Sequence, residues 1–407
     1  MLVLLLRVLV CCYIFLFGTV SAGYTKANTD MVASRITVNL PSRTIELFSG
    51  NNLVKEYPIA IGKPSTPTPL GYYSIVYKEV NPAWYPPDQK GKMVPSGPAN
   101  PLGYRWMGIW NNYGIHGTNA PWSIGTVVSN GCIRMYEADA EELFDMVSYG
   151  TPVLITYERV KIRTNSKGQI LLSIYPDVYG YGSIAIQDVR NKLSAYRVNA
   201  LVTDEFLRKM LNEPNDSQIA IANQFKVKVN AKLINEPGMV VQDVQYVPVY
   251  PVAEVLKQKI NWNEKAKTVQ CGLSTVPGIM SDNMVYVSTV NLSALFGSEQ
   301  SWKAEENTLS LNKMVVLLNE TPVNLEINKV QGILAVPALR LAETMGRKVK
   351  WSEETQVLTV SNNGQSAKVP ITMIGTVPYI KITNISQYFD AYVYWNEEAK
   401  TIELTYP

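Results

Sequence analysis

The stretch IHGTNAPWSIGTVVSNGCIRM, residues 115–135, contains the only histidine of the 407-residue chain, His116, and one of its four cysteines, Cys132. A cysteine attacks a carbonyl as its thiolate, and with an ordinary pKa of about 8.5 it needs a base or a positive neighbour near neutral pH. His116 is the one side chain here that can act as that base without a shifted pKa. The spacing alone leaves a second interpretation open, in which Cys132 is a small buried apolar residue and His116 belongs to a turn.

Two residues close to Cys132 fit the chemistry of acyl transfer. Gly131 allows the backbone to approach a substrate and can direct two consecutive N–H groups at a developing oxyanion. Arg134 lies two residues after Cys132, so both side chains lie on the same side of an extended segment, where the guanidinium can bind a carboxylate. Five aromatic residues near this stretch can either line a groove for glycan or peptide or pack in a core: Trp84, Tyr85, Trp106, Trp110 and Trp122.

The composition describes an ordinary globular protein. Hydrophobic residues make up 46% of the sequence and charged residues 17%, and the formal net charge is +3. Lysine and arginine alternate with aspartate and glutamate instead of forming a basic stripe, so nucleic-acid binding has little support. One histidine and scattered cysteines do not supply the clustered ligands of a zinc or copper site, so no metal or other cofactor is expected.

The N-terminus, MLVLLLRVLVCCYIFLFGTVSAGYTKA, has the pattern of a secretory signal peptide. An apolar run ends before a small-residue cleavage site at Ala22, so residues 1–22 are predicted to direct export. A retained membrane anchor is the alternative, although the run is barely long enough to span a bilayer. Removal of this segment leaves Cys132 and Cys271, and a disulfide between them would abolish thiol chemistry at Cys132.

The motifs HGT at 116–118 and SNGCIRM at 129–135 resemble the paired HxG and S-x-G-C-x-R motifs of the L,D-transpeptidase (YkuD-like) catalytic domain family. The resemblance covers residues 34–157 and includes TPTPLG, WYPPDQKGK and PLGYRW. It implies a mainly β domain with mixed sheets and a secreted enzyme that acts on peptidoglycan stem peptides. In that reaction a cysteine attacks the carbonyl of the third stem residue, expels the terminal D-alanine and passes the acyl group to an amine of a neighbouring stem.

The resemblance assigns catalytic roles to individual residues. Cys132 becomes the nucleophile, His116 the general base, and the backbone around Gly131 and Cys132 the oxyanion hole. Ser129 matches a motif position that shapes the site. A backbone carbonyl, such as that of Gly117, is expected to orient the imidazole, because no carboxylate belongs to the motif.

The resemblance also indicates residues that contact the substrate. Arg134 matches a motif position, and Gly117 and Trp106 lie in or next to matched segments. Asn130 stands where many family members have a second histidine, so an auxiliary role of that histidine is absent here. These four residues are the predicted substrate-binding set.

The C-terminal 180 residues contain a repeat. Four 17-residue stretches end at Trp262, Trp302, Trp351 and Trp395, and each is followed by an acidic or polar turn and a β-rich run. The repeat predicts an amphipathic helix, a tight turn and a strand pair, and four copies predict two paired modules. AVPALRLAETMGRKVKW, ending at Trp351, resembles the copper amine oxidase N-terminal-like domain, although no copper-binding cluster is visible. Each tryptophan is expected to fill the core of its own unit.

The sequence thus predicts an α+β protein built from several parts. A signal peptide at 1–22 precedes the catalytic domain at 34–157, a connecting segment with a hairpin and short helices at 158–224, and two small α+β modules at 225–315 and 316–407. The expected partners are peptidoglycan stem peptides and the cell wall, and the expected state is an exported, wall-associated bacterial monomer. An L,D-carboxypeptidase, in which water replaces the acceptor amine, and a non-catalytic wall-binding protein remain alternatives.

Overall fold

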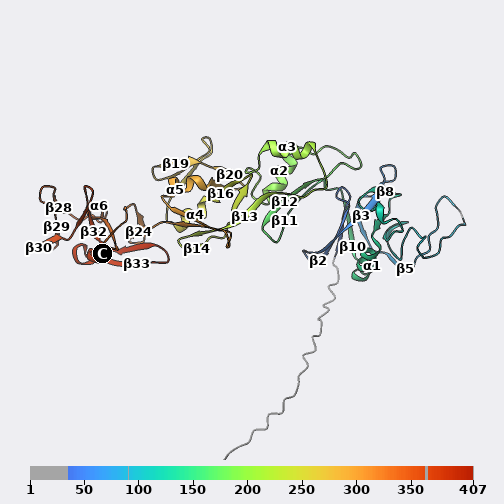
Figure 1. Ribbon diagram of the computed structural model, residues 1–407, viewed down its shortest axis with the longest axis horizontal. Helices are drawn as coiled ribbons and strands as arrows, with labels where there is room; N and C mark the ends of the chain where they lie inside the picture. The colour runs from blue at the N-terminus through green and yellow to red at the C-terminus, as the bar shows by residue number, and fades with distance from the viewer. Residues whose placement is uncertain (1–34, 90, 363–364, 407) are drawn as a thin grey trace, which may run out of the picture. The chain divides into compact units, whose positions relative to one another are not determined.

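The computed structural model describes residues 35–89, 91–362 and 365–406 (Figure 1). The predicted signal peptide, residues 1–22, lies outside the described residues and stays a prediction. Within the described ranges, no helix is both long enough and apolar enough to cross a membrane.

The first of two compact units comprises residues 35–38 and 43–156 and is mainly β. Its elements are β1 (Arg35–Asn39), β2 (Thr44–Ser49), β3 (Asn52–Gly62), β4 (Gly71–Ser74), β5 (Tyr77–Val80), β6 (Arg105–Trp110), β7 (Tyr113–His116), η1 (Pro121–Ser123), β8 (Val127–Ser129), β9 (Ile133–Met135), α1 (Glu137–Met146) and β10 (Pro152–Thr156). The strands join in the order β4-β10-β1-β2-β3-β9-β7-β6-β5, with β8 beside β3. The sheet is mixed, because β8 runs parallel to β3 and β9 parallel to β7, whereas β7 pairs antiparallel with β6.

Alternating apolar residues build the core of this unit. Apolar and polar residues alternate in RITVN and TIELFS, which predicts strands, and β1 and β2 bury every second side chain accordingly. Each such fully buried aliphatic side chain stabilises the fold by about 1.5–3 kcal/mol. The apolar residues after Tyr136 have helical spacing, and this stretch forms α1, which buries Ala140 and Leu143 and packs on β6 and β7. This packing fixes the strands that carry the motifs.

The second unit comprises residues 39–42 and the described residues from 157 onward. Its first elements are β11 (Val160–Thr164), β12 (Gln169–Ile174), α2 (Ile186–Ser194), α3 (Asp204–Asn212), β13 (Ile219–Val229), β14 (Lys232–Leu233), β15 (Gly238–Val241), β16 (Val244–Pro248), α4 (Val249–Val255), β17 (Ile260–Asn263), β18 (Thr268–Cys271), β19 (Ser274–Pro277), β20 (Ile279–Ser281), β21 (Met284–Ser288), η2 (Thr289–Asn291), α5 (Leu292–Phe296), β22 (Glu299–Lys303) and β23 (Thr308–Asn312). The remaining elements are β24 (Val315–Leu318), β25 (Thr321–Val323), β26 (Asn328–Val330), β27 (Ile333–Pro337), α6 (Ala338–Thr344), β28 (Val349–Ser352), β29 (Val357–Asn362), β30 (Gln365–Val369), β31 (Thr372–Ile374), β32 (Val377–Lys381), α7 (Ile382–Phe389), β33 (Tyr392–Asn396) and β34 (Thr401–Thr405).

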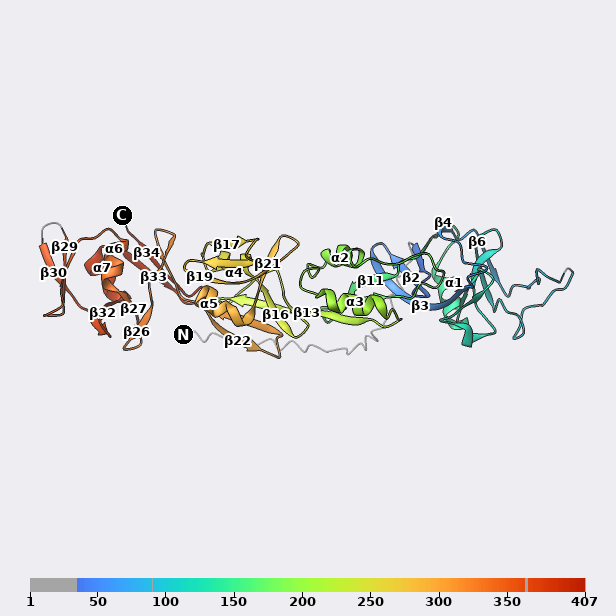
Figure 2. The same cartoon turned by 90° about the horizontal axis from the view of Figure 1, so that it is seen from above.

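The segment predicted to connect the domains, residues 158–224, contains the hairpin β11–β12 and the helices α2 and α3 (Figure 2). β12 continues into the following sheet by pairing with β13. Leu193 on α2 and Leu207 on α3 are fully buried in one core with Met239 on β15 and Tyr286 on β21. The segment is therefore packed against the sheet that follows it in sequence.

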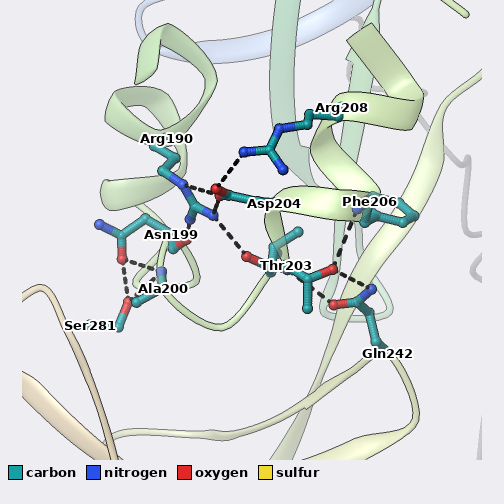
Figure 3. A network of polar contacts seen from close by, with 10 residues as sticks. Arg190, Asn199, Ala200, Thr203, Asp204, Phe206, Arg208, Gln242 and Ser281 are labelled. Atoms are coloured by element: carbon teal, nitrogen blue, oxygen red, sulfur yellow. Dashed lines mark hydrogen bonds and ion pairs between the residues drawn. The ribbon is translucent and has the colours of Figure 1, made fainter. Parts of the chain in front are cut away.

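A polar network fixes this segment at its turns (Figure 3). Arg190 on α2 forms an ion pair with Asp204 at the start of α3 and donates to the backbone oxygen of Asn199. Two further pairs reach turns of the sheet: Thr203 with Gln242, through two bonds of 3.1 Å, and Asn199 with Ser281. The two helices are thereby tied both to each other and to the sheet.

Each stretch that carries the predicted repeat contains a helix and a strand pair, whereas their grouping into two repeat modules stays a prediction. The helices α4, α5, α6 and α7 are each followed by an antiparallel pair, namely β17–β18, β22–β23, β28–β29 and β33–β34. The strands in front of the helices also pair, β16 with β21 and β27 with β32. α4 and α5 share one hydrophobic core, and α6 and α7 share another.

The repeat tryptophans differ from the prediction in how they pack. Trp262, Trp351 and Trp395 are half-buried and contact the edges of the two cores. Trp302 is 42% exposed, and its ring lies nearly perpendicular to that of Phe225, with ring centroids 5.4 Å apart. The prediction of a core position is wrong for Trp302, because β22 is exposed along almost its whole length.

Asn230 joins the two cores of this unit. It follows β13 with a left-handed φ of 45° and is buried. Its side-chain amide donates to the backbone oxygens of Lys313 and Ala399, at 2.7 and 2.8 Å, and accepts the Lys313 N–H at 2.8 Å. β13 runs parallel to β23, and β24 runs parallel to β34, so one amide contacts the chain beside both parallel pairs.

Candidate active site

Two neighbouring strands bring the ends of the motif stretch together. β7 and β9 run parallel, with Ile115 opposite Ile133 and His116 opposite Arg134. Both isoleucines are fully buried. Because successive side chains alternate between faces, His116 and Arg134 lie on the opposite face, together with Cys132 directly before β9. The only imidazole and the motif cysteine thus share one face of the sheet.

His116 is held in a buried, oriented position. Its side chain is 3% exposed, and its Nδ1 lies 2.6 Å from the backbone oxygen of Gly117, the contact expected from the sequence. A carbonyl only accepts, so Nδ1 carries the hydrogen and Nε2 is the basic nitrogen of the neutral ring. Burial lowers the pKa of His116 to about 4, although the backbones of Gly117 and Leu102 act in the opposite direction. The imidazole is therefore neutral near pH 7.

Trp106 forms one wall beside the imidazole. It lies directly opposite His116 in the β6–β7 pair, and the two rings stack with centroids 5.5 Å apart and planes 22° apart. The indole also covers Gly114, where a Cβ would lie 2.6 Å from the ring. Only a glycine at position 114 lets the indole lie this close to the strand.

Cys132 carries a half-buried free thiol. It donates to the backbone oxygen of Asn112 at 3.5 Å, and among the described residues no hydrogen bond joins it to His116. Burial raises the pKa of Cys132, while the backbone of Gly114 and the positive charge of Arg134 lower it. Since the imidazole pKa is depressed, the pair rests as a thiol and a neutral imidazole.

A tight turn sets the backbone in front of Cys132. Ser129 accepts the N–H of Gly131 at 3.0 Å and donates to the backbone oxygen of Cys132 at 2.6 Å. Gly131 has a φ of 112°, which strongly favours glycine, and Thr68 donates to its backbone oxygen at 2.9 Å. The expectation that both consecutive N–H groups point at an oxyanion is therefore corrected, because the Gly131 N–H is already bonded to Ser129.

Glu137, the first residue of α1, braces the segment that follows His116. Its Oε1 accepts the N–H of Tyr104 at 2.7 Å, and the backbone of Thr118 also bonds to the carboxylate. A Cβ at Gly117 would lie 2.3 Å from Oε2, and one at Gly103 would lie 2.0 Å from it. Glycine at both positions leaves room for this carboxylate between two chain segments.

The remaining predicted site residues differ in position. Arg134 is half-buried beside Cys132, and burial lowers the pKa of its guanidinium, while the charge of a Cys132 thiolate raises it. Asn130 lies exposed in the turn, away from the buried contacts of Ser129. Cys271 is buried in the second unit and free, so the disulfide alternative is wrong for Cys132 and Cys271. The described residues contain no group of three or more His, Cys, Asp or Glu side chains that could hold a metal ion.

Comparison with known proteins shows the family. Residues 33–155 match the model of the L,D-transpeptidase catalytic domain. A Bacillus licheniformis protein assigned as an L,D-transpeptidase YkuD is 42% identical over 145 residues, which cover 34% of this chain and 78% of that protein. The chain belongs to the L,D-transpeptidase family.

Other L,D-transpeptidases match the same part of the chain. A Salmonella typhimurium protein of the ErfK/SrfK type is 36% identical over 159 residues, which are 36% of this chain and 52% of that relative. The crystal structure of an Enterococcus faecium L,D-transpeptidase shares 29% identity, covers 30% of this chain and 50% of that chain, and has a TM-score of 0.26. The chain thus spans between about half and four fifths of these relatives.

Several residues of the L,D-transpeptidase site were missed by sequence reasoning. They are Thr68, Asn112, Gly114 and Glu137, which act through backbone contacts or close approach. Of these, Gly114 carried a signal, because a glycine within a strand often marks a place where another group approaches closely. The others are brought to the site by pairing between distant segments.

Proposed function

We propose that this protein is a peptidoglycan L,D-transpeptidase in which Cys132 attacks the carbonyl of the third stem residue, releases D-alanine and transfers the acyl group to an acceptor amine. The observation that carries the proposal is the placement of Cys132, His116 and Arg134 on one face of paired strands, within a domain of this family. His116 acts as the base, and Arg134 binds a substrate carboxylate.

The neutral imidazole supports a stepwise exchange of protons. As Sγ of Cys132 attacks, Nε2 of His116 takes the thiol proton, and the negative oxygen of the tetrahedral intermediate is stabilised by the Cys132 N–H. The D-alanine amine leaves with the proton from the imidazolium and a thioester remains. The acceptor amine then attacks, loses a proton to His116 and displaces the thiolate, which regains its proton.

For this to begin, the thiol turns from the Asn112 backbone oxygen toward the imidazole. Catalytic hydrogen bonds are often long or misaligned without substrate and tighten when it binds. Arg134 favours the thiolate that forms, because its positive charge acts against the burial of the sulfur.

The decisive experiment is incubation of the purified protein with tetrapeptide muropeptides, followed by mass spectrometry of the products. Cross-linked dimers with released D-alanine support transpeptidation. Tripeptide without dimers indicates the L,D-carboxypeptidase alternative, in which water is the acceptor. Unchanged substrate rejects both enzymatic readings and leaves the wall-binding alternative.

The C-terminal half is proposed to hold the exported enzyme at the cell wall. AVPALRLAETMGRKVKW, the stretch that carries α6, resembles the copper amine oxidase N-terminal-like domain, and this resemblance supports the assignment of the repeats to that type. Sedimentation with purified cell walls tests the role: the full chain should pellet, and a chain ending after residue 157 should pellet much less. Equal sedimentation of the two removes the anchoring role.

A further inference from the structure

Beside Cys132, three aromatic rings form a continuous ladder. Tyr113 and Trp110 are directly paired at the end of the β6–β7 hairpin, with ring centroids 5.6 Å apart and planes only 11° apart. Tyr73 on β4 follows, with its centroid 6.2 Å from that of Trp110. Trp110 is 46% exposed, so the ladder reaches the surface.

The ladder begins at the candidate active site. A Cβ at Gly131 would lie 2.4 Å from the ring of Tyr113, so this ring rests on the backbone immediately before Cys132. Asn112, next to Tyr113, supplies the backbone oxygen that accepts the Cys132 thiol. A substrate that is bound covalently at Cys132 and follows the ladder passes Tyr113 first.

The chemistry of the ladder suits an uncharged ring with polar edges. Its aromatic faces attract polarised C–H groups, and the tight turn between the strands adds the exposed side-chain amides of Asn111 and Asn112. None of these residues is charged, whereas the charged carboxylates of a stem peptide have Arg134, two residues after Cys132, as a partner. In a peptidoglycan substrate, the pyranose rings of the glycan are the moieties with apolar C–H faces and hydroxyl or amide edges.

The dimensions of the ladder agree with such an occupant. From the acyl carbonyl carbon of the third stem residue, the chain to the sugar runs through the N–Cα part of that residue, two further residues and a lactyl group. Three extended residue lengths span about 10 Å, and the lactyl group adds a few ångströms, for a total of about 13 Å. Measured from Tyr113, whose ring rests on the backbone before Cys132, successive ring steps of 5.6 and 6.2 Å lead to Trp110 and Tyr73, a length within this span.

We infer that Tyr113, Trp110 and Tyr73 form a saccharide subsite, which stacks a pyranose ring of the donor glycan while its stem peptide reacts at Cys132. This inference rests on the proposed function, because it takes peptidoglycan as the substrate. It adds a specificity element: the enzyme prefers stem peptides that are still attached to sugar.

Two donors that share the same tetrapeptide test the subsite, one free and one attached to the disaccharide. The measured quantity is the ratio of kcat/KM for the disaccharide donor to kcat/KM for the free donor. Trp110→Ala should lower this ratio about three- to tenfold, the range expected for loss of one aromatic stacking contact. Tyr72→Ala is the matched control, because Tyr72 is 87% exposed and next to Tyr73 on the opposite face of β4.

A ratio that is unchanged in Trp110→Ala, or that falls equally in Tyr72→Ala, overturns the subsite. Failure of the proposed function is distinguishable, because the wild type then converts neither donor. In that case, titration of Cys132→Ala with the disaccharide-tetrapeptide, followed by tryptophan fluorescence, still decides the inference. Binding that Trp110→Phe retains and Trp110→Ala weakens supports it, and binding that neither variant alters rejects it.

Discussion

Trp106 and His116 face each other across the β6–β7 pair, and the indole covers one side of the only imidazole in the chain. Stacking removes water from the ring, and loss of water disfavours the charged imidazolium. This explains why the pKa of His116 falls to about 4 although two backbone groups favour its protonation. The consequence is a base that is available over a wider pH range than an exposed histidine.

The acid limb of the pH profile should report this depressed pKa. Because the free imidazole is the active form and its pKa is about 4, kcat/KM should stay nearly flat as the pH falls from 7 to about 5 and decline only near 4. The measurement is kcat/KM for the tetrapeptide donor between pH 4 and 8. An acid limb centred near 6.5 would show that His116 is exposed to water in the working enzyme.

The free energy of unfolding should also depend on the protonation of His116. Between about pH 4 and 6.5 the unfolded chain binds a proton at His116 and the folded chain does not, so the free energy of unfolding falls as the pH drops through this window. The expected loss is about 3 kcal/mol at most. Comparison with His116→Gln, measured by urea unfolding at pH 7 and 4.5, isolates the effect, since the variant keeps every other titrating group. Equal pH dependence in both proteins contradicts it.

Removal of the His116 imidazole should lower the catalytic activity more than the stability of the fold. His116→Ala should lower kcat/KM by a factor of about 100 or more near neutral pH, which is the usual contribution of a general base. Trp106→Phe is the informative companion, because it keeps a ring against the imidazole and should keep most of the activity. A loss below about threefold in His116→Ala would mean that another group deprotonates Cys132.

Cys132 should behave as a resting thiol that is activated only during the reaction. Burial holds its pKa above the ordinary range, so alkylation by iodoacetamide should be slow at pH 7 and rise steadily toward alkaline pH. Peptide mass spectrometry locates the adduct, and Cys271→Ser serves as the control. A rate that is already maximal at pH 7 would instead indicate a preformed thiolate–imidazolium pair.

Cys132→Ala and Cys132→Ser should both lack acyl transfer, and a carbapenem should add its mass at Cys132 of the wild type.

Ser129 should matter through the turn that it closes. Ser129→Ala leaves the Gly131 N–H without its acceptor in a buried turn, which should destabilise the protein by about 1–3 kcal/mol and slow acylation of Cys132. Ser123→Ala is the matched control, since this buried serine donates to the backbone oxygen of Ala120, outside the turn. The acylation rate of the folded fraction should fall in Ser129→Ala alone, and an equal fall in both variants would assign the effect to stability.

Much of this architecture is visible in the sequence because it depends on local pattern. The alternation in RITVN and TIELFS predicts β1 and β2, and the spacing after Tyr136 predicts α1. The four Trp-centred repeats predict four helices with their strand pairs, since each unit is built from consecutive residues. The contact between His116 and the Gly117 backbone oxygen follows from the motif resemblance in the same local way.

Other features depend on pairing between distant segments and are invisible in one sequence. The commitment of the Gly131 N–H to Ser129 requires the exact turn geometry, and Glu137 reaches Tyr104 across thirty-three positions. The exposure of Trp302 depends on which strand lies at the edge of the sheet. Integration of residues 158–224 into the next sheet likewise depends on the pairing of β12 with β13.

The parallel pairing of β24 with β34 has a consequence for a chain under tension. These two strands begin and end the last repeat pair, with Val315 opposite Thr401 and Leu318 opposite Leu404. A pull on the two ends of this segment draws parallel neighbours past each other, so their hydrogen bonds are loaded together in shear instead of opening one after another. β13 and β23 repeat the arrangement in the preceding pair, and the Asn230 amide bonds to the chain where the two pairs meet. The C-terminal half thus contains two successive parallel strand pairs, β13–β23 and β24–β34, that resist a pull in shear. This arrangement is suited to transmitting force along the chain.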